Sequence, residues 1–90
     1  MMKLRLFTLP NCPRCPAAKK VAKTVVKQRE DITLEILDIS ETNNMTTALM
    51  MQIASTPSFA INETPIYISD VPTVEELNTL IDQYKQKSKL

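Results

Sequence analysis

The chain has no glycine and no histidine among its 90 residues, and it has only two cysteines. Without glycine there is no glycine-rich loop of the kind that holds phosphate groups, and any turn that needs a positive φ angle must use another residue. A tetrahedral structural zinc site needs about four nitrogen or sulfur ligands, so these two cysteines could bind zinc only in a dimer or with added carboxylates. The missing residues therefore argue against a phosphate-loop protein and against a zinc-stabilised fold.

The chain also lacks a strong charge of either sign and a long apolar run. Lysine and arginine number 11 against 10 acidic residues, and the net charge of +1 gives no general attraction to nucleic acid or to an anionic membrane. The first apolar run is interrupted by Arg5, so it matches neither a signal peptide nor a membrane span. We expect a cytoplasmic monomer that binds neither nucleic acid nor membrane and folds as one domain over residues 1–90.

The two cysteines, Cys12 and Cys15, stand three positions apart between segments of different periodicity. A strand-like apolar run precedes them, and alanine and valine recur with helical spacing after them. Residues three apart on a helix share a face, at a separation compatible with the roughly 4.4–6.8 Å between the Cα atoms of a disulfide. A Cys-X-X-Cys pair at a strand-to-helix junction predicts redox chemistry, because a disulfide closing so small a loop adds little stability.

The two thiols are predicted to have different roles. We expect Asn11 or Cys12 to cap the helix, with Pro13 as its first residue. Unpaired N–H groups and the helix dipole would then stabilise the thiolate of Cys12, and Arg14 adds a positive charge nearby. Cys15, one turn further in, would be less exposed and suited to resolving a mixed disulfide. Cys12 is therefore the predicted nucleophile and Cys15 the resolving thiol.

Periodicity predicts seven elements in the order strand, helix, strand, helix, strand, strand, helix. A strand, a helix and a strand of these lengths form a right-handed parallel crossover, and a turn at residues 62–65 makes a hairpin of the last two strands. The predicted strands cover residues 2–8, 32–39, 58–61 and 66–68. The first predicted helix starts at the cysteines and continues through residues 17–29, the second covers residues 45–54, and the third follows Thr73.

Three local features carry further expectations. Pro16 falls at about the fourth helical position, where its missing N–H is predicted to loosen the turn that holds the cysteines. The hairpin turn has no glycine, so Asn62 is expected to supply a positive φ angle if one is needed. Thr73 and Glu76 match a capping box at the start of the last helix.

This element order, with Cys-X-X-Cys opening the first helix and Thr56-Pro57 opening the third strand, resembles the thioredoxin superfamily in its minimal, glutaredoxin-sized form. The resemblance covers the whole chain, and residues 6–19 look especially like the small thioredoxins of methanogenic archaea. It implies an α/β, thioredoxin-like fold. Together with the crossover rule and the hairpin, it predicts a mixed four-stranded sheet of order 2-1-3-4 flanked by three helices.

The resemblance also implies a substrate site. By this resemblance, the peptide bond between Thr56 and Pro57 would be cis and would face the cysteines. For a bond before proline, the cis form lies only about 0.5–1 kcal/mol above the trans form in free energy. The backbone of Thr56 would pair with an extended substrate segment. The residues expected to bind substrate are Pro13, Arg14, Thr56, Pro57, Ser69 and Asp70.

The chain departs from both relatives that it resembles. Glutaredoxins usually carry Gly-Gly before the last helix, where the backbone approaches glutathione, and Ser69-Asp70 stands there. Typical thioredoxins carry a tryptophan before the first cysteine and a buried aspartate in the first strand, where this chain has Asn11 and, near the aspartate position, Leu6. In typical thioredoxins the buried aspartate assists proton transfer. In this chain, water or a surface carboxylate would accept the proton instead.

Three functions follow from these patterns. The first is reduction of protein disulfides through Cys12-Pro13-Arg14-Cys15, with no cofactor other than the redox-active pair and with a flavin-dependent reductase as electron donor. The second is a glutaredoxin-type oxidoreductase of mixed disulfides with low-molecular-weight thiols. The third is a non-enzymatic metal-binding module. With only Arg14 as an added cation, we expect a reduction potential nearer the about −270 mV of thioredoxin than the about −120 mV of a strong oxidant.

Overall fold

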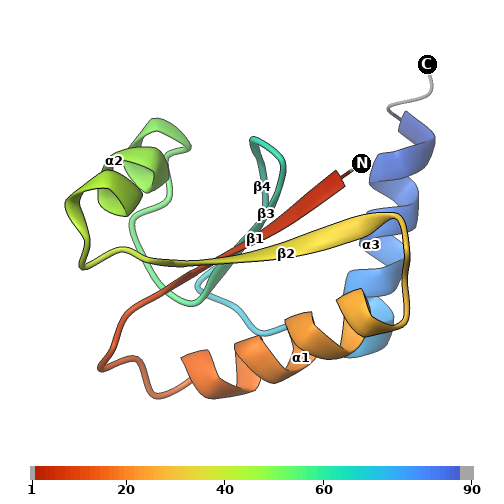
Figure 1. Ribbon diagram of the computed structural model, residues 1–90, viewed down its shortest axis with the longest axis horizontal. Coiled ribbons are helices and arrows are strands. Elements are labelled where there is room, and N and C mark those ends of the chain that lie inside the picture. The colour runs from red at the N-terminus through yellow and green to blue at the C-terminus, as the bar shows by residue number, and fades with distance from the viewer. Residues whose placement is uncertain (1, 88–90) are drawn as a thin grey trace.

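The computed structural model describes residues 2–87, which form strands and helices in the predicted order (Figure 1). The strands are β1 (Met2–Thr8), β2 (Ile32–Asp38), β3 (Ser58–Ile61) and β4 (Thr64–Ile68), and the helices are α1 (Cys15–Lys27), α2 (Thr42–Met50) and α3 (Val74–Lys87).

The four strands form one sheet in the order β2-β1-β3-β4, as predicted. β1 runs parallel to β2, with Leu4 opposite Leu34, and antiparallel to β3, with Leu6 opposite Phe59. β3 and β4 form the antiparallel hairpin. The predicted fold class is therefore confirmed, and β1 leads from the interior of the sheet directly into the segment that carries the cysteines.

The helices cover both faces of the sheet, with α1 and α3 on one face and α2 on the other (Figure 1). Side chains alternate along β1, so Leu4 and Leu6 join the core beneath α1 and α3, whereas Phe7 points toward α2. The larger core also contains Ala18, Ala22, Val25, Ile32, Phe59, Ile61, Leu77 and Ile81, and the smaller core contains Phe7, Ile39, Ala48, Ile53 and Ala60.

The first helix begins later than predicted. Its N-cap is Arg14 rather than Asn11 or Cys12, and Pro13 lies before the helix rather than at its first position. Pro16 is therefore the second helical residue, where the backbone N–H would have no intrahelical partner in any case. The prediction that this proline loosens the turn was wrong. It assumed that Pro16 removes the first intrahelical hydrogen bond, but a residue further along the helix donates that bond.

The second helix covers residues 42–50 rather than 45–54. It ends where Gln52 takes a φ angle of 60°, the left-handed conformation that glycine usually supplies. The N–H of Gln52 donates to the carbonyl of Leu49 at 3.0 Å, and the N–H of Ile53 donates to that of Ala48 at 2.8 Å. These two bonds form a Schellman motif, so the helix stops without glycine.

Both of the other local predictions are confirmed. Asn62 has a φ angle of 54° in the turn between β3 and β4, and its side-chain oxygen accepts a hydrogen bond from the N–H of Lys3 at 2.9 Å. In the capping box, the N–H of Thr73 donates to Glu76 at 3.0 Å and the N–H of Glu76 donates to the Thr73 hydroxyl at 3.1 Å. β4 begins two residues earlier than predicted and includes Pro65, which an edge strand tolerates.

Candidate active site

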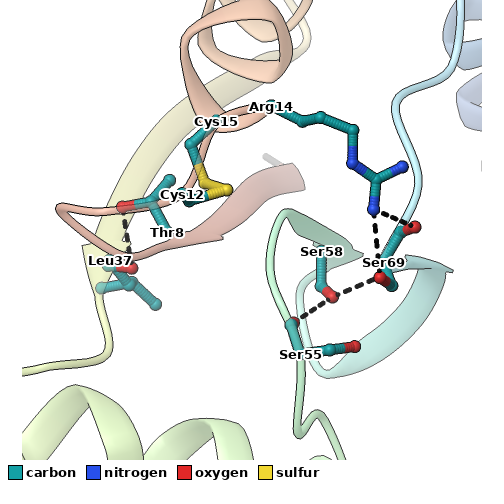
Figure 2. The surroundings of a disulfide bond; sticks show 8 residues. All are labelled: Thr8, Cys12, Arg14, Cys15, Leu37, Ser55, Ser58 and Ser69. Carbon is teal, nitrogen blue, oxygen red and sulfur yellow. Dashed lines mark hydrogen bonds between the residues drawn. A yellow bond between two sulfur atoms is a disulfide. The ribbon is translucent and has the colours of Figure 1, made fainter.

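The cysteine pair lies in the connection between β1 and α1 and forms a disulfide (Figure 2). The Cα atoms of Cys12 and Cys15 are 5.3 Å apart, within the predicted range, and the N–H of Cys15 donates to the carbonyl of Cys12 at 3.4 Å. Cys15, the first residue of α1, is 2% exposed and belongs to the buried core, whereas Cys12 is half-buried. Cys12, which lies before the helix, is therefore the more exposed of the two residues.

Thr56 and Pro57 lie at the same edge of the sheet as the cysteines. Phe7 pairs with Ser58, so the segment that follows β1 and the segment that precedes β3 are neighbours. The peptide bond between Thr56 and Pro57 is cis, as the resemblance implied. Pro57 is buried and Thr56 is half-buried, which leaves part of the Thr56 residue accessible beside the cysteine loop.

Arg14 links the cysteine loop to the connection between β4 and α3. One of its terminal nitrogens donates to the Ser69 carbonyl at 3.1 Å and to the Ser69 hydroxyl at 3.3 Å (Figure 2). Ser69 has a φ angle of 57°, a conformation that favours glycine. The N–H of Asp70 donates to the carbonyl of Pro57 at 3.1 Å. The structure therefore brings these predicted site residues together from three segments of the chain.

Two buried hydroxyl groups near the disulfide were not predicted. Thr8 is 4% exposed and Ser58 is fully buried, and they are the buried polar side chains among the residues that the structure describes. The hydroxyl of Thr8 donates to the Leu37 carbonyl at 3.5 Å. The hydroxyl of Ser58 donates to the Ser55 carbonyl at 2.6 Å. A small hydroxyl residue beginning an otherwise apolar strand is the signal that could have identified Ser58.

Asp38, a half-buried carboxyl group, lies at the cysteine end of the sheet, and no carboxyl group stands at the Leu6 position. Leu6, near the place where thioredoxins carry a buried aspartate, is fully buried in the apolar core. Asp38 lies opposite Thr8 in the β1–β2 pair, and its carboxylate accepts hydrogen bonds from the hydroxyl and N–H of Ser40. These bonds, the side-chain bond first, lower the pKa of Asp38. A lower pKa makes Asp38 a weaker proton acceptor than an ordinary carboxylate.

Within residues 2–87, no three or more cysteine, aspartate or glutamate residues lie close enough together to hold a metal ion. None of the helices in the described part of the chain is long and apolar enough to cross a membrane.

Comparison with known proteins places this geometry in a family. A family model described as "Thioredoxin domain" matches residues 2–82. The chain is 33% identical over 85 residues to a "Probable Thioredoxin" of Archaeoglobus fulgidus, covering 94% of this chain and 91% of that protein. It is 37% identical over 77 residues to a "Thioredoxin" of Methanocaldococcus jannaschii, covering 84% and 87% respectively. The chain therefore belongs to the thioredoxin family.

The solved structures agree on the fold. Chloroplastic thioredoxin z superposes with a TM-score of 0.78 at 12% identity, covering 96% of this chain and 80% of that chain. At this identity the likeness speaks for the fold alone. Family membership and the Cys12–Cys15 disulfide together identify the protein as a thiol-disulfide oxidoreductase.

Proposed function

We propose that the protein reduces disulfides of other proteins, with Cys12 as nucleophile and Cys15 as resolving thiol. The observation that carries the proposal is the difference in exposure between the two sulfur-bearing residues, half-buried Cys12 against Cys15 at 2%. A nucleophile must reach a sulfur of a folded partner, whereas a resolving thiol needs only to reach its neighbour.

The reaction proceeds in two exchanges. The thiolate of Cys12 attacks one sulfur of the target disulfide, which forms a mixed disulfide and releases the other target sulfur as a thiolate that takes up a proton. Cys15 then loses its proton to water and attacks the sulfur of Cys12. The second target sulfur leaves and is protonated. Two electrons have passed to the target, and the protein is left with the Cys12–Cys15 disulfide seen in the structure.

The proposed substrate surface surrounds this disulfide. Thr56 is half-buried, and its backbone would pair with an extended segment of the target, as strand-addition sites do. The hydrogen bonds from Arg14 to Ser69 and from Asp70 to Pro57 join three segments of the chain at the site, and this convergence supports the proposed surface. The residues proposed to bind substrate are Pro13, Arg14, Thr56, Pro57, Ser69 and Asp70.

A flavin-dependent, thioredoxin-type reductase is the proposed electron donor, because each turnover leaves the cysteine pair oxidised. The proposed setting is the cytoplasm, where a reducing pool keeps such pairs in use. We further propose a monomer that folds as one domain over residues 1–90 and uses no cofactor beyond its two cysteines.

A glutaredoxin-type activity on low-molecular-weight mixed disulfides is the second candidate. Ser69 stands where glutaredoxins carry glycine, and its φ angle of 57° shows that the backbone follows a glycine-like path there. However, the side chains of Ser69 and Arg14 meet at this place, where glutathione would approach the backbone. We therefore rank this activity below reduction of protein disulfides.

Two activity assays and a metal analysis separate the candidates. Purified protein is tested for insulin reduction driven by dithiothreitol and for reduction of a glutathione mixed disulfide, and its metal content is measured. Turnover of insulin without faster turnover of the glutathione substrate is the expected result. Faster turnover of the glutathione substrate would favour the second candidate. Stoichiometric zinc or copper without turnover of either substrate would favour a metal-binding module.

A further inference from the structure

Ser58 holds two backbone segments together behind the proposed substrate surface. Its hydroxyl donates to the Ser55 carbonyl at 2.6 Å and accepts a hydrogen bond from the N–H of Ser69 at 3.1 Å (Figure 2). Ser55 precedes Thr56-Pro57 and Ser58 follows it, so the first bond closes this short segment on itself. The second bond ties the segment to the connection between β4 and α3. One fully buried hydroxyl therefore satisfies a carbonyl and an N–H from two different segments.

The links continue from Ser69 to the cysteine loop. Ser69 accepts the two hydrogen bonds from Arg14, which lies between the cysteines. Ser69 also has a left-handed φ angle of 57°, which is unfavourable for a residue with a Cβ atom, and its N–H bond to Ser58 helps to hold that conformation. The position of the Arg14 side chain thus depends on a turn that Ser58 supports.

We infer that Ser58 is a positioning residue for disulfide exchange with protein substrates. Both of its hydrogen bonds go to backbone groups, so it acts on the substrate through Thr56 and Arg14 rather than by contact. The inference rests on the proposed function, because it assumes that the backbone beside Pro57 docks the target. An apolar residue at position 58 would leave a carbonyl and an N–H without their partner and would release the two segments from each other.

The test compares a protein substrate with a small one. In Ser58→Ala, KM for insulin should rise about tenfold, the equivalent of roughly one hydrogen bond, with kcat within about twofold of wild type. The reaction of reduced Cys12 with 5,5′-dithiobis(2-nitrobenzoate), a small disulfide that needs no backbone pairing, should also stay within about twofold. Ser58→Thr keeps the hydroxyl and should restore KM to within about threefold of wild type.

Ser55→Ala is the matched control. Ser58 contacts the backbone carbonyl of Ser55, and alanine keeps that carbonyl, so KM for insulin should not change. A second variant, Ser58→Val, introduces a side chain of about the same size as that in Ser58→Thr but without a hydroxyl. It should show the raised KM even if Ser58→Ala does not fold. A wild-type KM in a folded variant that lacks the hydroxyl would overturn the inference. An equal loss toward the small disulfide would also overturn it, because it would indicate a general disturbance.

A separate readout distinguishes failure of this inference from failure of the proposed function. If wild-type protein does not reduce insulin, the proposed function fails whatever Ser58 does. The backbone amide of Ser69 should still exchange its hydrogen at least about tenfold faster in Ser58→Ala than in wild type, because it has lost its acceptor. Equal exchange rates would show that Ser58 does not hold this turn, and the inference would fall.

Discussion

The two ends of the sheet are held together by different interactions. At the cysteine end, the links between segments run through backbone groups: Ser58 to Ser69, Asp70 to Pro57, and Arg14 to Ser69. At the other end, where α1 turns into β2 beside α3 (Figure 1), several of the links are ionic. The redox-active cysteine pair and the ion pairs around Asp31 therefore lie at opposite ends of the sheet.

The ionic end is a small network around Asp31. Arg29 approaches Asp31 at 3.0 Å and Asp82 at 2.8 Å, and Lys85 approaches Asp31 at 2.9 Å. The side chain of Arg29 is 14% exposed, so its charge is partly removed from water. In contrast, none of the three links at the cysteine end uses a carboxylate. A carboxylate there would disfavour the thiolate that the proposed mechanism requires of Cys12.

The largest expected effect follows from substituting the cysteines. Cys12→Ser should reduce insulin disulfides only at background rate, because serine cannot form the mixed disulfide. Cys15→Ser should accumulate a mixed disulfide with its target, visible as a higher-mass band on a non-reducing gel. Exchange of these two phenotypes would reverse the assigned roles. Partner proteins trapped by Cys15→Ser would also identify physiological targets.

The second test concerns the redox potential, which the cysteine end alone should set. We expect a value near the about −270 mV of thioredoxin rather than the about −120 mV of a strong oxidant, because Arg14 is the only cation within the motif. Equilibration of the dithiol with dithiothreitol or glutathione buffers measures it. A value near that of the oxidant would contradict the proposed reductase. Asp31→Asn should leave the potential unchanged, which makes it the matched control.

The third test breaks the ionic end. Asp31→Asn should lower the free energy of unfolding by about 1–2 kcal/mol, because the partly buried Arg29 and Lys85 lose a shared partner. Urea unfolding measures this change. Insulin reduction by the folded variant should stay within about twofold of wild type. A large loss of activity without a loss of stability would show that the two ends are coupled.

The fourth test uses pH at the same end. Hydrogen bonds from Arg29, and next from Lys85, hold the pKa of Asp31 well below its usual value. Because the pKa is lower in the folded state, the stabilisation is fully present above the unfolded pKa of about 3.9 and is lost as the pH falls below it. Wild type should therefore lose stability more steeply than Asp31→Asn as the pH falls below about 4. Parallel profiles would contradict this account.

The smallest expected effect belongs to Ser69→Gly at the cysteine end. Glycine keeps the backbone N–H and carbonyl that bind Ser58 and Arg14, and it accepts the φ angle of 57° without steric cost. Stability should change by less than about 1 kcal/mol, and KM for insulin should stay within about twofold. A raised KM would mean that the Ser69 hydroxyl, rather than its backbone, positions Arg14. Urea unfolding and insulin kinetics decide.

Short-range patterns in the sequence predicted much of this structure correctly. The capping box of Thr73 and Glu76 needs only residues three apart, and the positive φ of Asn62 follows from a glycine-free turn. The sheet order followed from the crossover, the hairpin and the resemblance. The boundary of α1 was misplaced, because Pro13 and Pro16 are both acceptable in the first turn of a helix and periodicity alone does not choose between them.

Hydrophobic period and motif spacing are local properties of the chain, so the element order and the cysteine pair can be read from the order of residues. Tertiary structure decided which residues surround that pair. Ser58 and Ser69 are 11 positions apart, and Arg14 and Ser69 are 55 positions apart. A serine in a sequence carries no mark of its distant partner. Its hydroxyl acquires a role only when folding removes water and leaves two backbone groups for it to bind.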